Sequence, residues 1–174
     1  MNGHLSILNS VILSVCLLIN TAQAVQPKNV ILLIGDGMGF EQVKAAGMYL
    51  NGAAGTLSFE ALPYQGQLTT YSANSSVTDS AAAGTALATG FKVNNGVISM
   101  AFPGDGRELR TSLEYYQLLG YRTGLVTTTY ITHATPATFG AHEPSRDNLR
   151  PVAGNRCQHG HQGLRPVRQH VSAL

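Results

Sequence analysis

The hydrophobic pattern of this chain begins, after residue 28, with a nearly continuous apolar run of strand length at residues 29–34. Such a run is typical of a strand buried on both faces of a parallel sheet. Residues 67–72 alternate enough to predict a second strand, and residues 124–129 predict another buried one. The Asn94-Asn95-Gly96 turn signal predicts a small hairpin within residues 92–100.

Between these segments the spacing of apolar positions changes to that of helices. Phe40 to Leu50 has helical spacing, Ser80 to Thr89 is a run of small residues that predicts a tightly packed helix, and Arg107 to Leu119 predicts an amphipathic helix that ends at Gly120. Strands that alternate with helices indicate an α/β fold, a three-layer sandwich with a largely parallel central sheet.

Residues 1–24 have the pattern of an export signal. Leu5 to Ile19 is mostly apolar and uncharged, and it leads to an A-x-A cleavage pattern ending at Ala24. The segment before Leu5 lacks Lys and Arg, which leaves a buried N-terminal helix as an alternative. We expect maturation after Ala24, a periplasmic or secreted protein, and no membrane association after cleavage.

Composition narrows the possible partners. The net charge is +2, and 11% of the residues are charged and 44% hydrophobic. The basic residues in the core of the chain do not gather in one patch, so no nucleic-acid partner is predicted. The two cysteines are Cys16, inside the signal, and Cys157, so no disulfide framework and no cysteine zinc pattern is expected.

The chain divides at residue 148. Residues 25–148 carry the α/β pattern, whereas residues 149–174 contain scattered Gly, Gln, His and Arg without either periodicity. We interpret residues 149–174 as a tail unrelated to the fold, produced by a shift of reading frame just after Asn148. A disordered basic tail is the alternative.

Asp36 is the first candidate for chemistry. It follows the buried run between Gly35 and Gly37, at the sheet edge where ligands bind in open α/β folds. A carboxylate there can bridge two cations. Asp36 capping the next helix is an equal alternative, and a dinucleotide site is disfavoured because Phe40 stands where the third glycine should be.

Ser80 is the second candidate, because it lies where a loop becomes a helix of small residues. The free N–H groups and the positive end of the helix dipole suit a phosphate and a developing alkoxide. Serine is a weak nucleophile without a base or a metal ion. The alternative is that Asp79 or Ser80 is only an N-cap, and the G-x-S-x-G nucleophile pattern is absent.

Two further segments complete the set. His133 and Thr135 follow the 124–129 run and could point to the same edge as Asp36, although a lone His in such a loop is more often a surface residue. Arg146 offers a planar fork that can hold two phosphoryl oxygens, with an ordinary surface Arg as the alternative. No role is assigned to His142 or Glu143.

Together and in this order, these motifs resemble the alkaline phosphatase family. The resemblance covers residues 29–148 through four segments: Ile34-Gly35-Asp36-Gly37-Met38-Gly39, Val77-Thr78-Asp79-Ser80-Ala81-Ala82, Thr132-His133-Ala134-Thr135-Pro136-Ala137 and Ser145-Arg146. It implies hydrolysis of small phosphomonoesters at alkaline pH with two Zn²⁺ and one Mg²⁺, and a possible homodimer.

The resemblance also implies a role for each matching residue. Ser80 matches the nucleophile that becomes phosphorylated, and Asp36 the carboxylate that bridges a zinc and the magnesium. Thr135 matches a magnesium ligand, and His133 a position just outside the magnesium ligands that tunes metal preference. Arg146 matches the arginine that holds the phosphoryl oxygens, and Asp79 the acidic residue that orients that arginine.

Family members continue beyond the matching region and supply the remaining metal ligands from later segments. Nothing after Arg146 matches those motifs, and His159, His161 and His170 have no acidic residue near them. The resemblance therefore predicts an incomplete sheet and an inactive chain. The alternatives are a non-catalytic exported fragment with weak phosphate or metal binding, and a related phosphodiesterase or sulfatase, which the Asp79-Ser80 pair disfavours.

Overall fold

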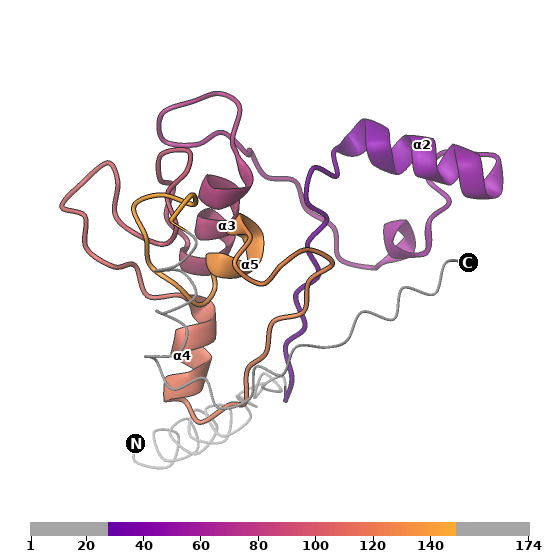
Figure 1. Ribbon diagram of the computed structural model, residues 1–174. Coiled ribbons are helices and arrows are strands. Elements are labelled where there is room, and N and C mark those ends of the chain that lie inside the picture. The colour runs from indigo at the N-terminus through magenta and orange to yellow at the C-terminus, as the bar shows by residue number, and fades with distance from the viewer. Residues whose placement is uncertain (1–27, 149–174) are drawn as a thin grey trace, which may run out of the picture. The chain divides into compact units, whose positions relative to one another are not determined.

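The computed structural model describes residues 28–148. The helices in this part of the chain are α2 (Phe40–Asn51), the short 3-10 helix η1 (Ser58–Ala61), α3 (Ser80–Thr89), α4 (Ser112–Leu118) and α5 (Ala134–Ala137) (Figure 1). The predictions of an export signal, an unpaired Cys157 and a tail unrelated to the fold all lie outside the described residues. None of the helices described here is long and apolar enough to cross a lipid bilayer.

Helix α3 has the bounds that its run of small residues predicts. Its N-terminus is capped by Asp79, whose side chain accepts a hydrogen bond of 2.9 Å from the N–H of Ala82. Its C-terminus is closed by Gly90, which has a φ of 80°, a left-handed conformation that favours glycine.

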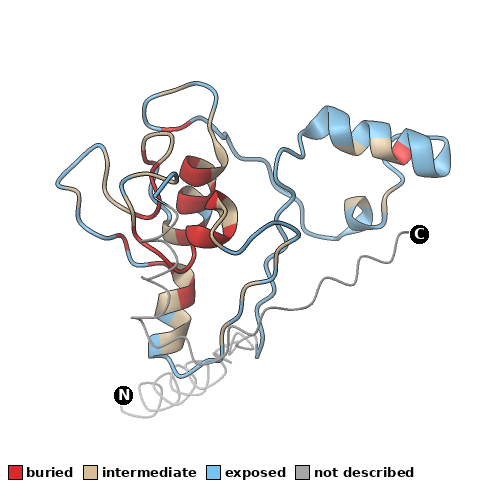
Figure 2. Ribbon diagram, in the orientation of Figure 1, coloured by how far each residue is buried: buried red, intermediate tan, exposed pale blue. Residues whose placement is uncertain are grey.

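The core of residues 35–148 is built around α3. Helix α5 packs on it closely, and α4 contacts it as well. Ala81 of α3 belongs to one buried cluster with Ala134 and Ala137 of α5, and Ala88 of α3 belongs to another with Leu113 of α4. Figure 2 shows that buried residues gather on α3 and α5. The small side chains let the two helices approach.

Helix α4 is shorter than the predicted helix over residues 107–119. It begins only after Thr111, because Thr111 and Glu114 form a capping box: the hydroxyl of Thr111 accepts from the N–H of Glu114, and the Glu114 carboxylate accepts from the N–H of Thr111. The cap residue Thr111 is extended, and Glu108 before it forms an antiparallel bridge with Met100. The predicted stop near Gly120 is confirmed.

The predicted hairpin within residues 92–100 is wrong. The N–H of Val97 bonds to the carbonyl of Asn94, so a turn does form there. However, Ile98 pairs with Glu143 and Met100 with Glu108, instead of pairing back on residues 92–93. The backbone groups of Ile98 and Met100 could have paired with residues 92–93 across the turn. Instead they pair with segments outside the predicted hairpin.

The strands predicted at residues 29–34, 67–72 and 124–129 are not present in residues 28–148, where the only paired positions are isolated bridges. A strand requires a neighbour for its N–H and C=O groups, and among the described residues 35–148 no sheet ladder includes residues 67–72 or 124–129. Ile31 and Leu33 are 84% and 89% exposed. The three-layer α/β sandwich therefore stays a prediction.

Helix α2 confirms the helix predicted at residues 40–50. Gly52 closes it in a left-handed conformation, with a hydrogen bond of 3.0 Å from its N–H to the carbonyl of Met48. Gly47 is the buried residue of this helix, and it faces the backbone of Ala53 and the side chain of Thr56. Apolar residues of α2 such as Tyr49 and Leu50 are exposed, so α2 contributes little to the core around α3.

Candidate active site

Asp36 lies in the tight turn that leads into α2. Gly37 has a φ of 68°, and the N–H of Met38 bonds back to the carbonyl of Gly35 at 3.3 Å. The exposed Asp36 side chain is therefore carried by a turn that requires glycine.

The Asp36 carboxylate joins two hydroxyls that lie far away in sequence. Its Oδ1 accepts a hydrogen bond of 2.9 Å from Ser80 Oγ, and its Oδ2 accepts one of 2.8 Å from Thr135 Oγ1. Ser80 is the first residue of α3, and Thr135 is in α5. The close packing of α3 on α5 brings the two hydroxyls within reach of one carboxylate. We call Asp36, Ser80 and Thr135 the hydroxyl–carboxylate cluster.

Asp79, next to Ser80, connects α3 with Arg146. While its Oδ1 caps the helix, its Oδ2 accepts from the N–H of Gly96 at 3.0 Å and from Arg146 Nη1 at 3.2 Å. The side chains of Asp79 and Arg146 are 26% and 28% exposed. Solvent therefore partly screens the ion pair, but the Asp79 carboxylate is held by three hydrogen bonds, from Ala82, Gly96 and Arg146.

The backbone of Arg146 is fixed to the same loop as its side chain. Its N–H donates to the carbonyl of Gly96 at 2.7 Å, while the N–H of Gly96 donates to Asp79. Asn95, the neighbour of Gly96, accepts from the N–H of Asp79 at 3.1 Å. The 94–96 turn therefore holds both members of the Asp79–Arg146 pair.

His133 is placed at the N-cap of α5, two residues before Thr135, without a hydrogen bond from its side chain to the helix end. Its ring stacks edge-on against Tyr130, with 5.2 Å between ring centroids. The structure thus brings Asp36, Ser80 and Thr135 together. It pairs Arg146 with Asp79, the residue before Ser80, and it places His133 at the N-cap of the helix that contains Thr135. The roles assigned to these residues stay predictions.

The donors at the cluster suit a hard cation only in part. One carboxylate and two hydroxyls are oxygen ligands of the kind that Mg²⁺ accepts, but Mg²⁺ needs about six ligands, and zinc sites usually include nitrogen or sulfur. Among residues 28–148 no group of three or more His, Cys, Asp and Glu side chains is placed to hold a metal ion. The described residues therefore fit part of a magnesium site.

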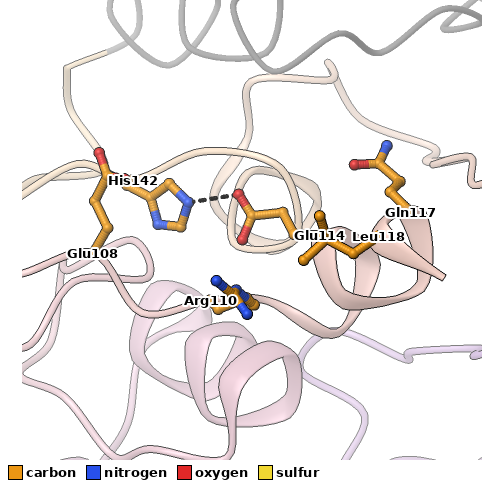
Figure 3. Close-up of a pocket in the computed structure, with 6 residues that line it drawn as sticks. All are labelled: Glu108, Arg110, Glu114, Gln117, Leu118 and His142. Atoms are coloured by element: carbon orange, nitrogen blue, oxygen red, sulfur yellow. Dashed lines mark hydrogen bonds and ion pairs between the residues drawn. The ribbon is translucent and has the colours of Figure 1, made fainter.

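Sequence analysis missed a second cluster, at the N-terminus of α4. The ring of His142, to which no role was assigned, has Nδ1 at 2.8 Å from the carbonyl oxygen of Ser99 and Nε2 at 2.8 Å from Glu114 Oε1. The pair borders a pocket lined also by Glu108, Arg110, Gln117 and Leu118 (Figure 3). The T-x-x-E spacing of the capping box was visible in the sequence, but the partner of Glu114 was not.

The contacts of this pair shift both titrations. Burial favours the neutral form of Glu114, but hydrogen bonds from His142 and from the Thr111 N–H, with the charge of His142, outweigh it and lower the pKa of Glu114 to about 2. Burial likewise opposes the charged form of His142, but its bonds to Glu114 and to the Ser99 carbonyl raise the pKa of His142. Both shifts favour the charged forms of the pair, the Glu114 carboxylate and the His142 imidazolium.

Comparisons with known proteins agree on one family. The family model described as alkaline phosphatase matches residues 27–169, which takes in part of the 149–174 segment. The origin of that segment stays a prediction. Alkaline phosphatase 3 of Bacillus subtilis is 46% identical over 132 residues, covering 72% of this chain, and streptomycin-6-phosphate phosphatase of Streptomyces griseus is 43% identical over 135 residues, covering 75%.

A solved structure gives the same result. Alkaline phosphatase from the Antarctic bacterium TAB5 superposes with a TM-score of 0.67 at 34% identity, covering 76% of this chain and 38% of that one. The chain spans 28% and 30% of the lengths of the two curated relatives. The order of its motifs, the family model and these relatives lead to one conclusion: the chain belongs to the alkaline phosphatase family.

Proposed function

We propose that residues 28–148 carry the nucleophile and the phosphate-binding residues of a site that hydrolyses small phosphomonoesters through a phosphoserine at Ser80. One observation supports this most directly. The Ser80 hydroxyl, at the N-terminus of α3, is bonded to Asp36, while the adjacent Asp79 holds the guanidinium of Arg146. The proposed nucleophile and the proposed phosphate-binding cation are thus connected through Asp79, the residue before Ser80.

The placement of Ser80 favours negative charge at its oxygen. It opens a ten-residue helix, whose N-terminal end carries a partial positive charge. Its proton is directed at Asp36 Oδ1, which leaves the oxygen lone pairs available to an incoming phosphorus atom. Arg146 supplies N–H donors for the phosphoryl oxygens, where charge gathers in the transition state.

The proposed reaction has two displacements. Ser80 Oγ forms a bond to phosphorus as the ester P–O bond breaks, and the leaving alcohol takes up a proton. Water then attacks the phosphorus of the phosphoserine, the Oγ–P bond breaks, inorganic phosphate leaves and Ser80 regains its proton. Arg146 holds the phosphoryl oxygens through both steps, and Asp79 keeps Arg146 in place.

Zn²⁺ and Mg²⁺ are the cofactors that we propose, with Asp36, Ser80 and Thr135 as ligands and His133 just outside them. When bound, such cations neutralise phosphoryl charge and help a hydroxyl or a water to lose its proton. The three oxygen donors of the hydroxyl–carboxylate cluster support this proposal. A variant of the TAB5 alkaline phosphatase has been solved with Mg bound in its M3 site.

For the 174-residue chain itself we propose phosphate and metal binding without turnover. The limited ligand set of residues 28–148 favours this outcome, since no group of three or more His, Cys, Asp and Glu side chains is placed to hold a metal ion there. We further propose that the protein is exported and that its fold is a three-layer α/β sandwich. For full-length members of the family we propose a homodimer.

The test is a titration of the 174-residue chain with inorganic phosphate in the presence of Mg²⁺, followed by phosphorus NMR. We expect saturable binding that Arg146→Ala weakens about tenfold or more. Arg107→Ala is the matched control, because that exposed arginine pairs only with Asp105 among the ion pairs of the described residues. Absence of saturable binding to the unaltered chain would contradict the proposed site.

A chromogenic phosphomonoester, assayed with Zn²⁺ and Mg²⁺, separates binding from catalysis. We expect no release of phosphate by this chain. Turnover that Ser80→Ala abolishes would show that the chain is active and that only the proposal of inactivity is wrong. Turnover that survives Ser80→Ala would remove Ser80 as the nucleophile.

A further inference from the structure

Each ring nitrogen of His142 faces an oxygen acceptor within the described residues. Nδ1 faces the Ser99 carbonyl oxygen, and Nε2 faces the Glu114 carboxylate. A neutral imidazole carries only one N–H, so both bonds form together only when the ring is doubly protonated. Because the His142 side chain is 2% exposed, water cannot easily replace a lost bond.

The acceptors of His142 belong to parts of the chain that are themselves fixed. Glu114 Oε2 accepts from the N–H of Thr111, and Thr111 Oγ1 donates to the carbonyl of Phe139 at 2.9 Å. Ser99 Oγ donates to the carbonyl of Thr138 at 2.6 Å. His142 thus connects the cap of α4 and the buried Ser99 to the chain that leaves α5.

The chain from His142 to Arg146 runs beside residues 96–98. The N–H of Glu143 donates to the carbonyl of Ile98, the N–H of Ile98 donates to the carbonyl of Glu143, both at 2.9 Å, and the N–H of Arg146 donates to Gly96. His142 is the buried side chain at the start of this run. His142 and Arg146 thus lie at the two ends of one short segment that backbone hydrogen bonds hold to residues 96–98.

We propose that His142, held doubly protonated between Ser99 and Glu114, is a positioning residue that fixes the 142–146 segment and so places the guanidinium of Arg146. This inference deepens the proposed function, on which it rests for the role of Arg146 in binding phosphate. None of the hydrogen bonds described for residues 28–148 joins His142 to Ser80 or Asp36. His142 acts on Arg146 through the backbone of residues 142–146.

The charged groups around the ring set the pH at which this positioning fails. Glu114 on α4 and Glu108 on the segment before it both favour the charged ring, while Arg110 lines the same pocket (Figure 3). Loss of a proton from His142 breaks one of the two ring hydrogen bonds, although the Ser99 carbonyl keeps its bond from the N–H of Leu109. Replacing Glu114 with Gln removes the nearest carboxylate charge that favours the protonated ring, so the proton is lost at a lower pH.

The experiment measures amide hydrogen exchange in the 174-residue chain by NMR, between about pH 5 and 9, alongside the His142 ring signals. For the unaltered chain we expect protection of the Arg146 N–H to fall as His142 deprotonates. In Glu114→Gln this fall should occur about one pH unit or more lower. The Ala83 N–H of α3 should show no step.

Glu108→Gln is the matched control, because it removes a carboxylate from the same pocket without removing a hydrogen bond to His142. We expect its Arg146 exchange to follow the unaltered chain to within about threefold. Equal exchange at Arg146 in Glu114→Gln and the unaltered chain at all pH values would overturn the proposal. So would a uniform rise that includes Ala83, because that result indicates only lower global stability.

Inorganic phosphate, titrated into the same samples, separates the two proposals. Phosphate affinity that falls over the same pH step as Arg146 protection supports both. A pH step in protection without any phosphate binding supports the positioning role of His142 and contradicts the proposed function. Phosphate binding that does not follow the step in protection overturns the positioning role.

Discussion

Ser80 and Asp36 lie 44 residues apart in the chain, yet Ser80 Oγ donates a hydrogen bond of 2.9 Å to Asp36 Oδ1. The second oxygen of the same carboxylate accepts from Thr135, 99 residues from Asp36. One exposed aspartate thus accepts hydrogen bonds from the first residue of α3 and from a residue of α5. A substitution at Asp36 therefore tests the whole cluster.

Replacing Asp36 with Asn should weaken binding of Mg²⁺ by about tenfold or more, because it removes the only negative charge of the hydroxyl–carboxylate cluster. Calorimetric titration of the 174-residue chain measures this. Asp105→Asn is the matched control, an exposed carboxylate whose ion pair is with Arg107. Equal Mg²⁺ affinity in the two variants would show that Asp36 holds no metal.

Replacing Asp79 with Ala should lower the free energy of unfolding by about 2 kcal/mol. The change removes the cap of α3 and the acceptor shared by Gly96 and Arg146. Asp79→Asn keeps one acceptor oxygen and should lose about half as much. Urea unfolding measures both; a loss as small as that of the exposed Asp105→Ala would show that the shared acceptor is unimportant.

Replacing Gly84 with Ala tests the close approach of α3 and α5. A Cβ at Gly84 would lie 2.6 Å from Thr138 Oγ1, and Thr138 is fully buried. The clash costs about 1–3 kcal/mol, which should exceed the gain of up to about 1 kcal/mol in helix propensity. The melting temperature should therefore fall.

Gly124→Ala is the control for this steric argument. Nothing lies within 4 Å of a Cβ at that position, so the melting temperature should change little. A rise in melting temperature on Gly84→Ala would show that the space beside Thr138 adapts without cost.

The Glu114–His142 pair predicts a stability maximum between about pH 4.5 and 6.5. The pKa of Glu114 is lowered from 4.5 to about 2 in the folded chain, so its contribution is present above about pH 4.5 and is lost as pH falls towards 2. The pKa of His142 is raised above 6.5, so its contribution is complete below about pH 6.5 and is lost as pH rises through the folded value.

Urea unfolding across this range measures the effect, with a loss on the acid side on the order of 3 kcal/mol at most. Glu114→Gln should flatten the acid side and lower the maximum. A profile that keeps its acid slope in Glu114→Gln would assign that slope to other carboxylates.

Local sequence was sufficient for α2 and α3, but it did not predict η1 or α5. The small residues from Ser80 to Thr89 between a capping Asp79 and Gly90 define α3, because caps and side-chain size act within a few residues. The motif order also indicated which residues to bring together, and Asp36, Ser80 and Thr135 do meet. The start of α4 was missed because Thr111 and Glu114 cap each other after an extended segment.

Long-range partners were decided only in three dimensions. The sequence by itself determined where α2 and α3 start and stop, since caps and helical spacing depend on neighbours in the chain. Only the tertiary structure paired Ile98 with Glu143 and His142 with Glu114. A backbone or ring N–H donates to the acceptor that tertiary packing brings within about 3 Å. The local sequence pattern does not encode which acceptor that is.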